Sequence, residues 1–324
     1  MYNDTHNNTN YWVEMLRSPE VDDRLVAVKS LQHLGEEEAI EPLIYALQDE
    51  NLNVQKIAIS ALWEIANPVA VPALLKCLGS PDAETRTEAL SALNDLVSPT
   101  HLSLLLNHLS HNNIYLQLNI LILLRKIHDV RSLPYIIQFF NSENADLREA
   151  AITTLRYLNQ VEKCPEALAL IFDPNATVRR ATALTLGYLQ DAEVISILSQ
   201  ALTSDSDWQV RRNAAKSLAI HENDQAISAL EIALGDEHWQ VRKSAAQTLQ
   251  KIPHIKVMPV LIQALTDEYA DVRKEVAIAL GHLGHPDAIN ALQQSLDDLD
   301  KEVSIQSLRA IKKIQESIKS STHD

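Results

Sequence analysis

The stretch that decides the fold is Trp208-Gln209-Val210-Arg211, which returns almost unchanged as Trp239-Gln240-Val241-Arg242. The two arginines lie 31 residues apart, and further steps of 31 or 32 residues reach equivalent positions along the whole chain. Self-similarity at a fixed period of this length indicates a solenoid of stacked repeats. We call the ten equivalent positions the register column: Arg24, Gln55, Arg86, Gln117, Arg148, Arg179, Arg211, Arg242, Arg273 and Ser304.

Each repeat is predicted to contain two amphipathic helices. Apolar or small residues recur three, seven and ten positions after the register residue, a spacing that places them on one face of a helix. A second run of this kind precedes the next register residue, as in Ile227, Leu230 and Leu234. The intervening turns carry Asp, Asn, Ser and Pro, and an Asn or Asp four residues before the register suits a helix N-cap. The sequence therefore predicts an all-α solenoid of about ten helical pairs with a 31-residue period.

Length, composition and charge limit the domain organisation and the partners. From 324 residues of repeats we expect a single solenoid over residues 11–318, with a C-terminal tail over residues 319–324. Residues 1–10 are polar and rich in Asn, so we expect a disordered N-terminal tail and no signal peptide there. The formal net charge of −15 argues against nucleic-acid binding. No apolar stretch approaches the roughly 20 residues that a membrane span needs.

Cysteine and histidine usage provides no catalytic or metal-binding motif. Cys77 and Cys164 lie nearly three repeats apart, too far for a disulfide, which favours buried reduced thiols in a cytoplasmic protein. The histidines around His108 and around His282 lack Cys or carboxylate partners at metal-ligand spacing. A Gly-rich phosphate loop, an HExxH motif and a nucleophile elbow are also missing. We therefore predict no catalytic residue, no metal and no cofactor.

The register column and the column after it predict two different roles for basic side chains. We expect the register arginines to form a structural ladder in which each guanidinium meets the acidic turn of its own or the next repeat. One residue further on, four consecutive repeats carry a cation, which would form a basic stripe on one half of an acidic chain. The alternative is a solvated face whose cations balance local acids. The members of this basic stripe are Arg180, Arg212, Lys243 and Lys274.

Aromatic residues accompany the basic stripe. Trp208 and Trp239 start adjacent second helices and would suit an aromatic anchor for a protein partner or a flat ligand. The alternative is that each indole packs over its turn as an oversized core residue. Tyr157 and Tyr188, nine residues after their register positions, form a second candidate aromatic pair. We predict that these four residues, with the basic stripe, bind the partner or ligand.

The repeat around Gln117 has a second helix that is apolar nearly all round. Such a helix is either covered by another element or offers an exposed contact surface. Because no spare element follows from the sequence, we predict a homodimer or heterodimer contact through this fourth repeat. The predicted apolar patch consists of Ile114, Tyr115, Leu118, Ile122 and Leu123.

An Asp-rich turn followed by Val-Arg-x-x-Ala-x-x-x-Leu resembles HEAT repeats over essentially the whole chain. The short period and the two Trp-Gln-Val-Arg segments are similar to the phycobilisome-lyase HEAT-like branch, the family of E/F-type bilin lyases. The resemblance implies a HEAT-like alpha-alpha superhelix whose second helices line the concave face. It also implies a protein-binding adaptor, assembly or chaperone-like factor, with a phycobiliprotein as candidate partner.

Two alternatives to the adaptor remain open. One is a bilin lyase subunit that attaches or removes a linear tetrapyrrole at a phycobiliprotein cysteine. In that case the tetrapyrrole is the bound substrate, its propionates meet the basic stripe, and the indoles stack on its rings. The other is a purely structural scaffold that joins two proteins.

Overall fold

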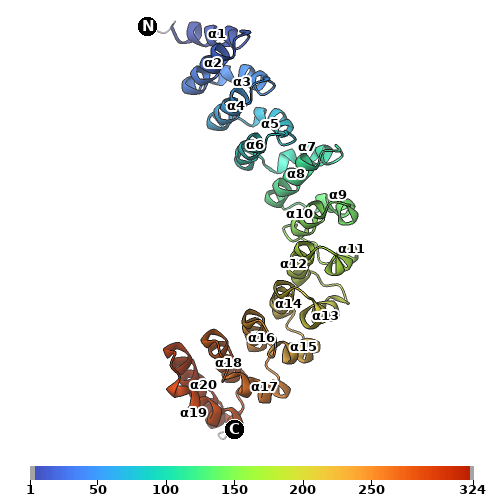
Figure 1. Ribbon diagram of the computed structural model, residues 1–324, viewed down its shortest axis with the longest axis vertical. Helices are drawn as coiled ribbons and strands as arrows, with labels where there is room; N and C mark the ends of the chain where they lie inside the picture. The colour runs from blue at the N-terminus through green and yellow to red at the C-terminus, as the bar shows by residue number, and fades with distance from the viewer. Residues whose placement is uncertain (1–3, 322–324) are drawn as a thin grey trace. The chain divides into compact units, whose positions relative to one another are not determined.

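The structure, a computed structural model, describes residues 4–321 and consists there of twenty α-helices, short 3₁₀ helices and no strand. Its contacts divide the chain into two compact units, an N-terminal unit of Met1–Gln160 and a C-terminal unit of Val161–Asp324. Each unit is a stack of helical hairpins (Figure 1). The all-α solenoid architecture that the register predicts is thereby confirmed.

The N-terminal unit contains five hairpins. The even-numbered helix of each hairpin follows an acidic or Asn-containing turn and contains the register residue, as predicted. Its helices are α1 (Asp4–Met15), α2 (Val21–Leu34), α3 (Ile40–Ala46), α4 (Leu52–Ile65), α5 (Val71–Cys77), α6 (Ala83–Leu96), α7 (Leu102–Leu109), α8 (Ile114–Ile127), α9 (Leu133–Ile137) and α10 (Ala145–Leu155).

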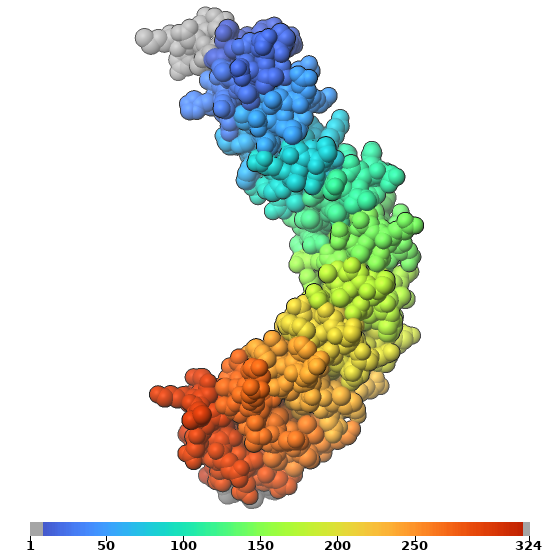
Figure 2. All heavy atoms as spheres, viewed as in Figure 1, coloured from blue at the N-terminus to red at the C-terminus, as the bar shows by residue number. Residues whose placement is uncertain are grey.

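The C-terminal unit repeats this arrangement. Its even-numbered helices pack one against the next and lie on the inner side of the gradual bend within this unit, coloured from yellow to red in Figures 1 and 2. Its helices are α11 (Pro165–Leu168), α12 (Ala176–Thr185), α13 (Val194–Ser204), α14 (Trp208–His221), α15 (Ile227–Ala233), α16 (Trp239–Lys251), α17 (Met258–Ala264), α18 (Ala270–Leu283), α19 (Ile289–Gln294) and α20 (Lys301–Ser321).

The ends of the described chain differ from the expected tails. Helix α1 begins at Asp4 and so includes most of residues 1–10, which we expected to be a disordered tail. Helix α20 continues to Ser321, into the expected tail at 319–324. Residues 1–3 and 322–324 lie outside the described residues. A single solenoid over residues 11–318 stays a prediction, because each unit is a compact body by itself.

The core lies between successive hairpins and follows the predicted columns. Ala58 and Leu62, three and seven residues after Gln55, are almost completely buried, and the same columns are buried in the other repeats. Small residues bring neighbouring second helices close together: a Cβ added at Gly281 of α18 would lie 2.9 Å from the Cβ of Ala310 in α20. Burial of these apolar faces supplies most of the stability of such a stack.

The helix starts also follow the predicted pattern. Asn51 caps α4 by accepting hydrogen bonds from the backbone N–H groups of Asn53 and Val54. An Asn or Asp at this cap position makes equivalent bonds at α6, α8, α10, α12 and α14. Two second helices of the C-terminal unit depart from it, because His238 and Tyr269 occupy the cap position without a side-chain cap bond. Over the part of the chain that the structure describes, no helix is long and apolar enough to cross a membrane.

The prediction that Leu123 belongs to an exposed patch is wrong, because its side chain is completely buried. Its column, six residues after the register, holds Ser or Thr in several repeats, and we interpreted those residues as a polar face. Except for Ser30 they are buried instead: Ser217 donates to the Ala183 carbonyl and Thr248 to the Ala215 carbonyl, each on the preceding second helix. The column therefore marks a helix-to-helix contact, and Leu123 fills it with apolar volume.

Candidate binding surface

The register arginines tie consecutive turns together. Arg211 donates from Nη1 to the carbonyl oxygen of Asp205, in the turn of its own repeat, over 2.9 Å. Its Nε and Nη2 donate to the carboxylate of Asp236, in the turn of the next repeat, over 2.7 and 3.0 Å. This fork satisfies a planar guanidinium on both sides and sets the spacing of two repeats. The predicted ladder is confirmed in the pairs Arg24–Asp49, Arg179–Asp205, Arg211–Asp236, Arg242–Asp267 and Arg273–Asp298.

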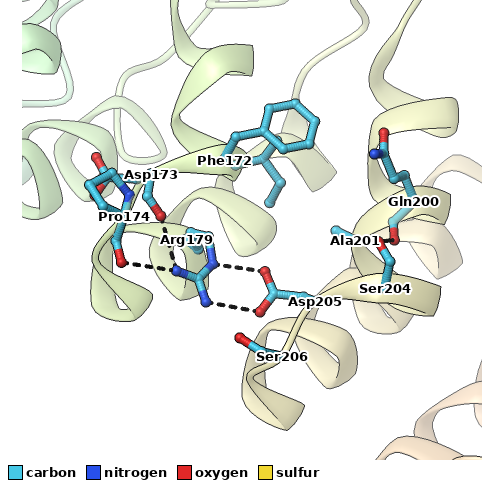
Figure 3. Close-up of a pocket in the computed structure, with 10 residues that line it drawn as sticks. Phe172, Asp173, Pro174, Arg179, Gln200, Ala201, Ser204, Asp205 and Ser206 are labelled. Atoms are coloured by element: carbon cyan, nitrogen blue, oxygen red, sulfur yellow. Dashed lines mark hydrogen bonds and ion pairs between the residues drawn. The ribbon is translucent and has the colours of Figure 1, made fainter.

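A pocket of about 430 Å³ lies beside one rung of the ladder (Figure 3). Figure 3 shows the Arg179 guanidinium between the carbonyl oxygens of Asp173 and Pro174 and the carboxylate of Asp205. The charged groups of this pocket are therefore already paired with each other. A second pocket, of about 300 Å³, lies at the equivalent place beside Gln55 in the N-terminal unit. We conclude that such pockets arise from the stacking of turns and are not a specialised site.

Two stacked aromatic pairs distinguish the C-terminal unit. The rings of Trp208 and His238 lie 5.5 Å apart at an interplanar angle of 9°, and those of Trp239 and Tyr269 lie 5.3 Å apart at 16°. In each pair the indole starts one second helix, and its partner occupies the cap position of the next. Both indoles are half-buried. Each indole therefore packs over the following turn, as one interpretation predicts, and is only partly accessible. Its role as an anchor for a partner stays a prediction.

We call Trp208, His238, Trp239 and Tyr269 the aromatic strip. Cations lie over its rings: the Arg212 guanidinium carbon is 5.2 Å from the Trp208 ring centre, and Lys243 Nζ is 5.7 Å from that of Trp239. Such cation–π contacts hold the rings and the basic side chains in fixed relative positions. The structure thus brings the predicted tryptophans and two residues of the basic stripe together at the start of α14 and α16.

Most of the basic stripe is balanced by acids. Arg180 forms an ion pair with Asp207, and Lys243 and Lys274 both contact Asp271 over 3.0 and 3.3 Å. The hydrogen bond from Arg180 lowers the pKa of Asp207, and that from Lys243 lowers the pKa of Asp271. For these three cations the alternative interpretation, a solvated face that balances local acids, describes the structure. Arg212 is the exception.

The far end of the aromatic strip opens into a pocket of about 290 Å³. Trp239, Tyr269 and Lys274 line it together with Asp300 and Glu302 of the last repeat. The structure therefore brings Trp239 and Lys274 to one pocket, while their role in binding stays a prediction. The acids on its other wall make this end of the surface less positive than the sequence of the basic stripe indicates.

The tyrosine pair falls into two different units. Tyr157 belongs to the N-terminal unit, where Arg156 lies 5.3 Å above its ring and its carbonyl oxygen contacts His128 Nδ1 over 2.7 Å. Tyr188 belongs to the C-terminal unit, where its side chain is exposed. A joint site of Tyr157 and Tyr188 stays a prediction.

The apolar patch of α8 is smaller than predicted. Ile114, Tyr115 and Ile122 are exposed, whereas Leu118 is half-buried. The Arg86 guanidinium carbon lies 4.0 Å from the centre of the Tyr115 ring and covers one of its faces. What remains is a surface of three partly accessible apolar side chains, without the buried Leu123.

Both cysteines are free and buried, as predicted. Burial raises the pKa of the Cys77 thiol to about 11 and that of the Cys164 thiol to about 12. Neither thiol supplies a thiolate nucleophile near neutral pH, because that chemistry requires a lowered pKa. Among the described residues there is no group of three or more His, Cys, Asp or Glu side chains arranged to hold a metal ion.

Three contributors to this surface were missed from the sequence. His238 and Tyr269 stack on the indoles, and Lys216 lies beside Arg212 on α14. The sequence contains a signal for His238 and Tyr269. Each is an aromatic residue at a helix N-cap position that holds Asn or Asp in other repeats, and each lies in the repeat that follows a tryptophan. Comparing each column with its neighbour one repeat later would have revealed both pairs.

Stacked helical hairpins joined by an arginine ladder define an α-solenoid repeat protein. A family model described as HEAT repeats matches residues 9–94, 165–250 and 230–312, and the chain belongs to this family. Among curated proteins no sequence matches this chain. The comparisons with known proteins thus identify HEAT repeats and not the phycobilisome-lyase branch.

Solved structures share the fold at low sequence identity. An engineered protein matches at a TM-score of 0.53 and 21% identity, over 95% of this chain and 99% of its own. A chain in the structure of Kap95p with RanGDP matches at 0.64 and 13% identity, over 95% of this chain and 50% of its own. A chain of the Kap95:Nup1 complex matches at 0.62 and 14% identity, over 96% of this chain and 51% of its own. This protein spans about half the length of the latter two chains.

Proposed function

We propose that this chain is a protein-binding scaffold whose C-terminal unit holds a partner against the aromatic strip. The observation that carries the proposal is the pair of half-buried indoles, each fixed by a stacked ring and a cation. Tryptophan is enriched among the residues that dominate binding energy in protein interfaces. Because these rings are already held in place, little side-chain entropy is lost when a partner covers them.

Membership of the HEAT-repeat family supports this proposal. Repeat solenoids present long preformed surfaces, and protein binding is a general use of such surfaces. The Kap95 structures that share the fold are complexes with the proteins RanGDP and Nup1. We infer the same general mode here, in which a rigid stack of helices offers one face to a protein.

The test is affinity capture with immobilised full-length protein, followed by calorimetry with each purified component that is recovered. The variant is Trp208→Ala combined with Trp239→Ala. The matched control is Trp63→Ala, which removes another partly exposed indole from the N-terminal unit. We expect the double variant to weaken binding by about 100-fold or more, as loss of interface tryptophans does, while the control binds as wild type. Equal affinities for the double variant and wild type would overturn the proposal.

The phycobilisome setting and the bilin lyase alternative rest on the resemblance alone, whereas a cytoplasmic location rests on the two free cysteines and stays a prediction. The first two are tested by titrating a free linear tetrapyrrole, and separately an apo- and a holo-phycobiliprotein. Pigment binding that the double tryptophan variant abolishes would support the lyase alternative. Binding to the phycobiliprotein but not to the pigment would support the adaptor. A dimer through Ile114, Tyr115 and Ile122 also stays a prediction, to be checked by light scattering of wild type and an Ile114→Ser, Ile122→Ser variant.

A further inference from the structure

The column directly after the register shows how this protein normally neutralises its cations. Lys56 pairs with Glu84, Arg180 with Asp207, and Lys243 with Asp271. In every case the acid comes from the next repeat. It lies either four residues before the next register residue, as Asp207 does, or two residues before it, as Glu84 and Asp271 do. At least one of these two positions is therefore acidic after Lys56, Arg180 and Lys243. Lys274, the remaining cation of this column apart from Arg212, contacts Asp271 of its own repeat.

Arg212 lacks both of these acids. The two positions in the repeat after it are occupied by His238 and Gln240, which carry no carboxylate. Its Nη2 donates to the side-chain oxygen of Asn213 over 3.3 Å. Its Nε is buried and has no hydrogen-bond partner among the described residues. An unsatisfied buried N–H costs free energy, so the guanidinium of Arg212 is held here without full pairing.

A second cation adds to this imbalance. Lys216 lies one turn after Arg212 on α14, and within the described residues it has neither a hydrogen bond nor an ion pair. Lys216 is exposed, yet partial desolvation by its neighbours, followed by the charges of Arg212 and Lys243, lowers its pKa. The nearby acids are already engaged, Asp207 by Arg180 and Asp271 by Lys243. A local positive site therefore lies within a chain of net charge −15.

We propose that Arg212 and Lys216 bind a carboxylate of an acidic segment in the protein partner, beside Trp208. This assignment rests on the proposed function and names the chemistry of the partner. The guanidinium of Arg212 supplies the planar fork that binds a carboxylate, and Lys216 supplies a point charge beside it. Asp207 and Asp271 flank the cluster, so it suits one or two carboxylates of a peptide and would repel the continuous phosphates of a nucleic acid.

The test is fluorescence anisotropy with a labelled polyglutamate peptide as the probe, at low salt and at about 0.15 M ionic strength. The first variant is Arg212→Gln combined with Lys216→Gln. Its control, Lys29→Gln combined with Lys56→Gln, makes the same charge change at the equivalent column positions of the N-terminal unit. We expect the first variant to raise the Kd by about tenfold or more, and the control to leave it near that of wild type.

A third variant supplies the missing acid. Gln240→Asp places a carboxylate where the next repeat has Asp271, and it leaves the stacked ring of His238 in place. We expect Gln240→Asp to lower the affinity for the peptide as strongly as the first variant does, although it retains every cation. Equal binding of polyglutamate by wild type and the first variant, or equal binding of polylysine and polyglutamate by wild type, would overturn the inference.

The failure of this inference can be distinguished from the failure of the proposed function. A captured partner that is lost with the tryptophan variant but retained by Arg212→Gln, Lys216→Gln and by Gln240→Asp would leave the scaffold proposal intact and refute the acidic segment. A partner retained by all of these variants would refute both. Circular dichroism of each variant establishes that a change in affinity does not come from unfolding.

Discussion

The two units fill the same register column in different ways. In the C-terminal unit Arg179, Arg211, Arg242 and Arg273 each bridge to an aspartate of the next turn. In the N-terminal unit the bridge is interrupted. Gln55 and Gln117 stand in the column, and the position that would supply an acid to Arg86 holds His111. The Arg86 guanidinium lies over the Tyr115 ring instead.

One contact survives in both units. A register side chain donates to the backbone carbonyl six residues earlier, whether it is Arg211 to Asp205, Gln55 to Asp49 or Ser304 to Asp298. The difference between the units teaches that the register residue has two separable tasks. Most register residues close their own turn in this way, although Gln117 donates to the Leu109 carbonyl eight residues earlier, whereas bridging to the next turn is an addition. That addition is most regular in the unit that also carries the aromatic strip.

Removing one complete bridge should have the largest effect. We expect Arg211→Ala to destabilise the C-terminal unit by about 4 kcal/mol, since it leaves the buried carboxylate of Asp236 without its ion pair. Arg86→Ala should cost about 1 kcal/mol, because that arginine loses hydrogen bonds to the carbonyls of Ser80 and Pro81 but no carboxylate partner. Hydrogen exchange measured by mass spectrometry over α14 and α6 reports each unit separately. Equal losses at the two positions would show that the bridge to the next turn adds nothing.

The period of the sequence was sufficient to predict the helices, the caps and the ladder. These features depend on one residue type at one position, and ten repeats of the pattern average out the exceptions. Arg211 and Asp205 illustrate this, since each falls in a column whose geometry is common to both units. The aromatic strip could be predicted only in part, because Trp208 and Trp239 stand out from their column but their stacking partners belong to the next repeat.

Side-chain polarity misled the prediction in one column. Ser217 and Thr248 satisfy their hydroxyls on carbonyls of the preceding helix, so a polar residue there is no sign of solvent. Leu123 is apolar, but it is buried like most of the Ser and Thr residues at the equivalent positions. The imbalance at Arg212 could not be inferred from its own column either, since it depends on the absence of an acid at two positions of the repeat that follows.

The N-terminal unit is expected to depend on apolar burial where the ladder is interrupted. Leu123→Ala should destabilise it by about 3 kcal/mol, because a completely buried leucine is replaced and a cavity remains. Ile122→Ala, at the neighbouring exposed position, should cost less than about 1 kcal/mol. Urea unfolding of each variant, monitored by hydrogen exchange in α8, measures the loss of stability in the two variants. If Leu123→Ala lowers the free energy of unfolding as little as Ile122→Ala does, the burial of Leu123 would be contradicted. Leu123 would then belong to the exposed patch that the sequence predicts.

The smallest expected effect concerns the helix ends, which the two units share. Ala66 ends α4 and Glu222 ends α14 in left-handed conformations, with φ of 56° and 48°. A side chain is strained there by about 1 kcal/mol, and replacement by Gly removes this strain while adding freedom to the unfolded chain. We expect Ala66→Gly and Glu222→Gly each to stabilise its unit by about 0.5 kcal/mol, and Gly284→Ala, at the equivalent end of α18, to destabilise by a similar amount.

Thermal unfolding of Ala66→Gly and Glu222→Gly then shows whether the two units differ only in the ion pairs of the register arginines, or also at their helix ends. Similar gains are expected, because the backbone N–H of Ala66 and that of Glu222 each bond to a carbonyl four residues earlier, although that of Ala66 also contacts the Trp63 carbonyl. A gain at Glu222 that exceeds the gain at Ala66 would contradict this expectation. Such a result would mean that backbone strain at the end of α14 is coupled to the ion pair of Arg211 at the start of α14. The register residue would then affect the stability of its whole helix, in addition to the two turns that it connects.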